Sequence, residues 1–232
     1  MNMRHRIVPA EIGKRERLHS RRNLSRTAAA VALALIAMIF SGCETGSVRV
    51  IDTSRTFNTV VIDAGHGGHD AGTRSRAGGL EKNDALAVAR RLEADLRAAG
   101  FRTVMTRSDD TFIPLDRRAR ISNRQDNAVF VSIHFNEARA RDVHGAEVHY
   151  KSRPSIEIAR RIVAKLEALP GGSSRGVKYA DFRVLKRNQY PAVLVECGFL
   201  SNPSEACRCA SGAYQDKLAG AITAALVEQR RR

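Results

Sequence analysis

The chain of 232 residues contains no tryptophan, only four cysteines, and 5% aromatic residues. Four cysteines are too few for the dense disulfide framework of a small secreted scaffold. Cys207 and Cys209 are two residues apart and have no second closely spaced pair, so the sequence contains no zinc ribbon. We predict that both are loop cysteines.

Several other signatures are missing. The stretch GHGGHDAGT (65–73) is not followed by the Gly-Lys-Ser/Thr ending of a P-loop, and Ser132 lies outside any GxSxG pattern of a serine hydrolase. The net charge is +15, of which +9 lies beyond residue 42, but the arginines are not interleaved with aromatic residues. Charge alone is no signature of nucleic-acid binding, so we predict no nucleic-acid partner.

Residues 1–42 are typical of a lipoprotein-type export signal. A basic run, SRRNLSR (20–26), precedes thirteen apolar residues, AAAVALALIAMIF (28–40), a length that suits a signal peptide better than a membrane span. The small residues before Cys43 resemble a lipobox, whose cysteine is lipidated and becomes the mature N-terminus. We therefore expect an exported protein in the cell envelope or periplasm, anchored to a membrane at Cys43, with residues 43–57 as the lipidated cysteine and a linker.

The rest of the chain has the pattern of one α/β domain. Apolar runs alternate with segments of helical period, which favours a largely parallel sheet covered by helices on both faces. Neither a repeat nor a second domain is evident. Strands are predicted over 59–63, 101–106, 128–134, 146–150, 182–185 and 192–196, and helices over 81–99, 114–124, 156–169 and 215–229.

Titratable side chains follow three of the predicted strands. The first strand leads to His66, the strand over 128–134 ends at His134, and the strand over 192–196 ends at Glu196. In open α/β sheets, ligands bind beyond the carboxyl ends of the strands. Three such groups at one edge predict a chemical site there.

These residue types suit a catalytic zinc ion. Catalytic zinc takes three protein ligands, often two histidines and a carboxylate, and keeps one position for water. His66 and His134 are the natural pair, and Glu81 in AGGLEKN is our choice of carboxylate. The pattern alone favours a different explanation of Glu81, as an acid of the first helical turn that interacts with the helix dipole.

Glu196 has a separate predicted role. Its carboxylate could accept a proton from the activated water and deliver it to a leaving amine; the alternative is a salt-bridged strand end. Cys197 is one residue further along the strand, so we expect it to point to the opposite face, into the core. We expect the remaining histidines to be solvated or to support the site: His69, His144 and His149.

The series of motifs resembles a known family. In order, the motifs are VIDAGHGGHDAG, GGLEKN, MTRSDDTFIPLDRRARISN, VSIHFN, GAEVHY and RGVKYADFRVLKRNQYPAVLVECGFLSN. Over about residues 58–228 they are similar to the zinc-dependent N-acetylmuramoyl-L-alanine amidases of the amidase type 3 family. The resemblance implies an α/β fold with a mostly parallel sheet of about six strands. It also implies cleavage of the amide bond between N-acetylmuramic acid and L-alanine in peptidoglycan, with residues 58–230 as the zinc amidase domain.

The resemblance carries over to individual positions of this sequence. The family's three metal ligands and its catalytic glutamate fall on the residues chosen above: His66, Glu81, His134 and Glu196. The resemblance thus favours Glu81 as a ligand over the helix-dipole explanation. Arg118 and Asn123 match recurrent family positions that we expect to support the site.

One departure from the family concerns regulation. Cell-division members carry a long insertion whose helix blocks the zinc, whereas here only YKSRPS (150–155) separates the GAEVHY strand from the next predicted helix. We therefore expect activity without an obligatory activator. Two alternatives stay open: a zinc peptidase or amidase that cleaves another bond of the wall peptide, and a non-catalytic wall-binding lipoprotein.

Overall fold

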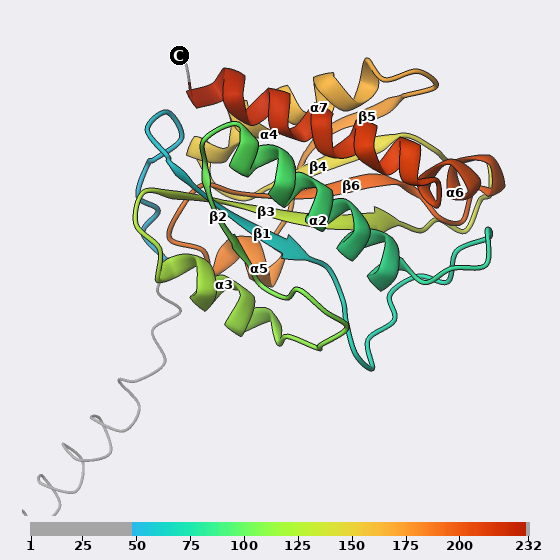
Figure 1. The fold of residues 1–232 in the computed structure, drawn as a ribbon, viewed down its shortest axis with the longest axis horizontal. Coiled ribbons are helices and arrows are strands. Elements are labelled where there is room, and N and C mark those ends of the chain that lie inside the picture. Colours follow the sequence, from blue (N-terminus) through green and yellow to red (C-terminus); the bar gives the residue numbers. More distant parts are fainter. Residues whose placement is uncertain (1–47, 231–232) are drawn as a thin grey trace, which may run out of the picture. The chain divides into compact units, whose positions relative to one another are not determined.

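The computed structural model describes residues 48–230, so the predicted export signal and Cys43 lie outside the described residues. Six strands form one sheet in the order β2-β1-β3-β6-β4-β5 (Figure 1). Neighbouring strands are parallel except for β4 and β6. The strands are β1 (Thr59–Ala64), β2 (Arg102–Met105), β3 (Ala128–Asn136), β4 (Ala146–Tyr150), β5 (Ser174–Tyr179) and β6 (Ala192–Phe199). The predicted α/β fold with a mostly parallel sheet is therefore confirmed.

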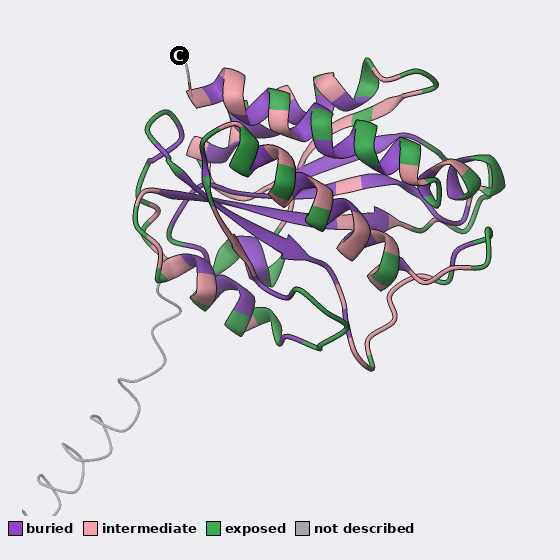
Figure 2. Ribbon diagram, in the orientation of Figure 1, coloured by how far each residue is buried: buried purple, intermediate pink, exposed green. Residues whose placement is uncertain are grey.

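Helices cover both faces of the sheet (Figure 1). One layer consists of α2 (Glu81–Ala98), α4 (Ile156–Glu167) and α7 (Gly212–Arg230), and the other of α3 (Leu115–Asn123) and α5 (Arg183–Lys186). Successive side chains of a strand point to opposite faces. In β1, Val60 therefore packs in the larger core under α2, α4 and α7, whereas Val61 packs in the smaller core under α3 and α5. Figure 2 shows the central strands buried between the two layers.

The described residues contain a complete core. Both buried clusters draw only on residues between Phe57 and Leu226. A fragment that begins at Ser47 keeps every one of these residues, so we expect it to fold on its own. No helix among residues 48–230 combines the length and the hydropathy needed to cross a bilayer.

Three predictions of local structure are wrong. The strand predicted over 182–185 is wrong, because residues 183–186 form the short helix α5. Its two apolar residues, Val184 and Leu185, both reach the smaller core from one turn, whereas Phe182 is exposed. Strand β5 was not predicted, since it is a half-exposed edge strand without an apolar run. The predicted loop cysteines, Cys207 and Cys209, lie in helix α6 (Pro203–Cys209). Asn202, followed by Pro203, was a sequence signal for the start of this helix. In the structure its side chain accepts a hydrogen bond from the backbone N–H of Glu205, as an N-cap does.

The predicted linker over 43–57 is also too long. Thr53 is buried and its hydroxyl donates to the carbonyl of Ala128 at the start of β3. Phe57 is fully buried and its ring stacks on that of Phe101, with 5.5 Å between the ring centroids. The domain therefore begins by Thr53, and residues 53–57 belong to it. The sequence did not indicate this, because Phe57 is the single apolar residue in an otherwise polar segment.

Candidate active site

The site begins with the loop after β1. His66 has a backbone φ of +58°, in the left-handed region that is costly for residues other than glycine. The buried guanidinium of Arg118 donates from Nη2 to the His66 carbonyl at 2.6 Å and from Nη1 to the carboxylate of Asp63 at 2.8 Å. Arg118, predicted to support the site, thus holds the strained residue in place from helix α3.

Sequence reasoning missed a second buried arginine that holds this loop. Arg107, just after β2, is 4% exposed and donates hydrogen bonds to four backbone carbonyls: those of Ala64, Gly65, Lys82 and Asp109. These bonds join the His66 loop to the first turn of α2. The only available signal was the place of Arg107 in the motif MTRSDD, where it looks like a surface residue.

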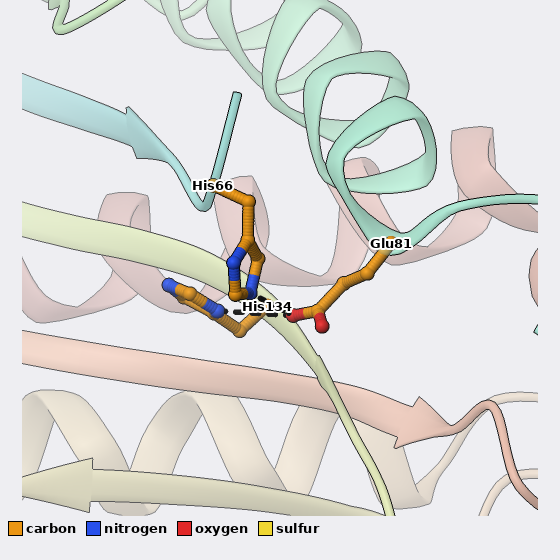
Figure 3. A group of neighbouring side chains, drawn as sticks. All are labelled: His66, Glu81 and His134. Carbon is orange, nitrogen blue, oxygen red and sulfur yellow. Dashed lines mark hydrogen bonds and ion pairs between the residues drawn. The ribbon is translucent and has the colours of Figure 1, made fainter. Parts of the chain in front are cut away.

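Glu81 reaches both histidines from the start of helix α2 (Figure 3). It occupies the first turn of α2 and is 3% exposed. Its Oε1 is 2.9 Å from Nε2 of His66 and 3.0 Å from Nδ1 of His134, which projects from β3. Oε1 also accepts the backbone N–H of Phe135, and Oε2 accepts that of Thr73. Interaction with the helix dipole alone does not explain this arrangement, because both oxygens of the buried carboxylate have specific hydrogen-bond partners.

Glycines allow these side chains to approach the backbone. A Cβ at Gly65 would lie 2.4 Å from the ring of His134. A Cβ at Gly72, where φ is +65°, would lie 2.6 Å from Oε2 of Glu81 and 2.7 Å from Cδ2 of His66. Any other residue at either position would displace one of the three side chains. The glycine-rich loop is thus needed for close approach as well as for its turn.

The three side chains form a charge-coupled group. Burial of His66 opposes its protonation, but hydrogen bonds to Glu81 and Asp70 outweigh burial and raise its pKa. Burial of Glu81 opposes ionisation, but hydrogen bonds from His134 and His66 outweigh it and hold its pKa well below the usual range. Nδ1 of His66 is 2.9 Å from Asp70, so both ring nitrogens of His66 face carboxylates. This pairing requires an imidazolium, whose proton a bound cation would replace.

The donor set fits a metal ion. Nitrogen and oxygen donors from His66, Glu81 and His134 all lie within 4.8 Å of one another, as one metal site among residues 48–230 would require. A carboxylate behind a ligating histidine, the place of Asp70 behind His66, is the usual device that fixes the ring and its tautomer. The residues predicted as ligands are therefore brought together with the support that a metal centre needs.

Glu196 faces the same space from β6. It is the cross-strand neighbour of His134, and its Oε2 is buried without a hydrogen-bond partner. Burial raises the pKa of Glu196 to about 7. A carboxyl group with a free oxygen and a pKa near neutrality is suited to accept and release a proton at physiological pH.

A cleft of about 560 Å³ opens over these groups. His66, Glu81, His134 and Glu196 line its floor. Its walls are largely apolar, with Phe112, Ile113, Leu115, Phe182, Val184 and Leu194 among the lining residues. The cleft thus combines a polar catalytic floor with walls that can bind a bulky ligand.

Other predicted positions lie elsewhere. Asn123 does not line the cleft; its amide bonds Arg187 and Gln189, which ties the end of α3 to the turn after α5. His69 packs against Phe112 rather than joining the metal ligands. Cys197 is buried in the larger core, as its strand position predicted.

Comparisons with known proteins give a consistent result. A sequence model of the N-acetylmuramoyl-L-alanine amidases matches residues 60–228. The N-acetylmuramoyl-L-alanine amidase LytC of Bacillus subtilis is 38% identical over 168 residues, which are 71% of this chain but 34% of LytC. The chain therefore spans about a third of the length of that relative.

Solved structures match over almost their whole length. The N-acetylmuramoyl-L-alanine amidase AmiC2 of Nostoc punctiforme is 36% identical, with a TM-score of 0.72, over 75% of this chain and 97% of AmiC2. The CwlD amidase of Clostridioides difficile, solved in complex with the GerS lipoprotein, is 31% identical, with a TM-score of 0.71, over 74% of this chain and 98% of CwlD.

Proposed function

This chain belongs to the N-acetylmuramoyl-L-alanine amidase family, and we propose that it hydrolyses the amide bond between N-acetylmuramic acid and L-alanine in bacterial peptidoglycan. The observation that carries this proposal is the arrangement of two histidines and a carboxylate beside Glu196 on the floor of one cleft. These groups can activate water and handle a proton. Among residues 48–230, no serine or cysteine lines the cleft, which suits direct attack by water.

We propose that His66, Glu81 and His134 hold Zn²⁺, the ion that prefers this mixture of nitrogen and oxygen ligands. When bound, zinc lowers the pKa of a coordinated water to about 7 and polarises a carbonyl oxygen. Asp70 fixes the ring of His66, and Arg107 and Arg118 hold the loop that carries it. These three residues position the ligands and make no contact with the bond that breaks.

Glu196 moves the proton. Its Oε2, which has no hydrogen-bond partner, accepts a proton from the attacking water and delivers it to the nitrogen of the departing L-alanine. Because the pKa of Glu196 is raised to about 7, the carboxyl group can serve in both directions near neutral pH. The apolar walls around Phe112 and Phe182 bind the glycopeptide and exclude water from the reacting groups.

We infer that no activator is needed. Strand β4 ends at Tyr150 and α4 begins at Ile156, so the connection between them holds only one short 3₁₀ turn (Arg153–Ser155) and no long helical insertion. The neighbour CwlD is known in complex with a lipoprotein, which makes the point worth testing. We also propose that the protein is exported and anchored at Cys43 in the cell envelope, on the strength of its N-terminal sequence.

The test is a digest of purified peptidoglycan by the fragment that begins at Ser47. Products are identified by mass spectrometry, with zinc present and with a chelator. We expect chelator-sensitive release of peptides whose free amino terminus is L-alanine. Glu196→Gln should lose turnover by about 100-fold or more while keeping zinc. Glu167→Gln is the matched control, since Glu167 is exposed on α4, outside the cleft.

Other outcomes would redirect the assignment. Cleavage at a different bond would indicate a zinc peptidase or another amidase. Binding of zinc without any cleavage, in the absence of added proteins, would contradict the proposal of independent activity. Unchanged turnover in Glu196→Gln would show that the proton is handled by another group.

A further inference from the structure

The edge of the sheet opposite the cleft is rich in arginine. We name this surface the entry edge and define it as residues 49–58, 100–102, 123–127 and 187–189. The central parallel strands β1, β3 and β6 begin there (Figure 1). The cleft, by contrast, is lined by His66, His134 and Glu196, which lie toward or beyond the carboxyl ends of these strands. In Figure 1 the arrowheads of β1 and β3 point to the right, and the entry edge is on the left.

Hydrogen bonds join these four segments into one surface. The backbone N–H of Ile51 donates to the carbonyl of Gln189, and that of Arg102 donates to the carbonyl of Asn58. The N–H of Gln189 donates to the side chain of Asn123. Residues 56 and 127 bond each other through both side chain and backbone. The charges on the four segments therefore belong to a single surface.

The entry edge carries five arginines and two aspartates, Asp52 and Asp126. By contrast, the loops at the cleft edge (65–80, 106–114 and 137–145) carry five basic and five acidic residues. Of these two edges, only the entry edge therefore carries a surplus of positive charge. All five arginines of the entry edge are exposed: Arg49, Arg55, Arg102, Arg124 and Arg187.

None of these five guanidinium groups forms a salt bridge among the described residues. Arg102 donates to the neutral amide of Gln125. Exposed Ile51, 52% accessible, lies on the same surface. Unpaired cations around an exposed aliphatic side chain favour an anionic, partly apolar partner.

The short distance along the chain between the entry edge and Cys43 points to a membrane as that partner. Ile51 is eight residues from Cys43, and eight extended residues span at most about 28 Å. A lipid at Cys43 would therefore hold the entry edge near a bilayer, whereas the cleft lies at the other edge of the sheet. The proposed reaction takes place in the cleft, so the entry edge is free to bind a different partner.

We propose that the entry edge docks on an anionic lipid surface, so that the domain stands on the membrane with its cleft facing away, toward the wall. The phosphates of anionic lipids bind Arg49, Arg55, Arg124 and Arg187, and Ile51 enters the interface. Docking supplements a lipid anchor, since one acyl chain or one basic patch alone holds a protein weakly.

The test uses the fragment from Ser47, which lacks Cys43 and so isolates the surface from the anchor. Its flotation is measured with vesicles of phosphatidylcholine, with and without about a quarter of phosphatidylglycerol, at about 0.05 M and about 0.5 M salt. We expect binding only to the anionic vesicles and only at low salt. A soluble muropeptide assay on the same samples reports amidase activity independently, so failure of docking and failure of the proposed function are distinguishable.

Two variants with the same change of charge locate the surface. The entry-edge variant replaces Arg49, Arg55, Arg124 and Arg187 with glutamine. The control replaces four exposed arginines of the cleft-edge loops: Arg74, Arg76, Arg139 and Arg141. Each arginine near an anionic surface contributes roughly a five-fold factor. We expect the entry-edge variant to lose between ~25-fold (two arginines in contact) and ~600-fold (all four) in partitioning, and the control to lose much less, with both variants melting as the parent does.

Three results would overturn the proposal. The first is equal binding to anionic and neutral vesicles. The second is equal loss in the two variants, which would indicate attraction by net charge alone. The third is retention on insoluble peptidoglycan that depends on the entry-edge arginines without vesicle binding, which would make the partner a wall polymer.

Discussion

Replacing Gly72 with alanine should strongly weaken zinc binding while lowering the stability of the fold only slightly. The new Cβ would lie 2.6 Å from Oε2 of Glu81 and 2.7 Å from Cδ2 of His66, whereas ordinary contacts are 3.4–4 Å. Two of the three proposed ligands must therefore move by close to 1 Å to relieve the overlap. A functional metal site tolerates shifts of only about 0.2 Å in its ligand distances.

The expected magnitudes follow from these distances. Loss of an outer-shell partner typically costs roughly 10- to 100-fold in metal affinity, and displacement of two ligands should cost at least the upper value. The backbone contributes separately, since Gly72 has a φ of +65° and alanine in the left-handed region costs about 1–2 kcal/mol. In a domain of this size, that corresponds to a Tm lower by roughly 2–8 °C.

Gly78→Ala is the matched control. Gly78 also has a positive φ, +92°, but a Cβ there meets nothing within 4 Å. Both variants should therefore be destabilised by alanine at a positive φ, and only Gly72→Ala should lose zinc affinity. Zinc affinity is measured by competition with a chromophoric chelator, and stability by thermal melts of the metal-free proteins. Equal zinc affinity in the two variants would refute the role assigned to close approach at Gly72.

Three further predictions concern neighbouring residues. Asp70→Asn should weaken zinc binding by roughly 10-fold with little change in the Tm of the metal-free protein, because the amide orients His66 less firmly; unchanged affinity would exclude this support. Arg107→Lys should lower the free energy of unfolding by about 1–3 kcal/mol and weaken zinc binding, because an ammonium group cannot donate to all four carbonyls that the guanidinium binds. Urea unfolding measures the first effect and a zinc titration the second. Burial raises the pKa of Glu196 from 4.5 to about 7, so ionisation opposes folding and the metal-free parent should lose about 3 kcal/mol of stability between pH 5 and pH 8 relative to Glu196→Gln. Parallel stability curves for the two proteins would contradict the buried position of Glu196.

The central strands were easier to predict than the edge of the sheet. The central strands β1, β3 and β6 are buried on both faces, so each is a continuous apolar run. Edge strand β5 has no such run, because one neighbour and partial exposure select no apolar pattern. The turn of α5 was mistaken for a strand because two consecutive apolar residues fit either structure.

The candidate site was predictable wherever a titratable residue follows an apolar run. His134 and Glu196 follow apolar runs, and parallel strands bring their carboxyl ends to one edge. Glu81 was ambiguous from its pattern, and the family resemblance favoured it as a ligand. In the structure its Oε1 lies within 3.0 Å of both histidines. Arg107 could not be found, because a buried arginine that binds carbonyls has the same local sequence as an exposed one.

The sequence by itself determined the α/β class, the edge at which the chemistry gathers and the residue types available there. These features are local: apolar period, strand ends and the glycines of VIDAGHGGHDAG. Only the tertiary structure decided which oxygens and nitrogens meet, that Arg107 and Arg118 hold a strained His66, and that arginines outnumber acidic residues on the edge away from the cleft. Those properties depend on segments that are far apart in the chain, and their distances are set by packing of the whole sheet.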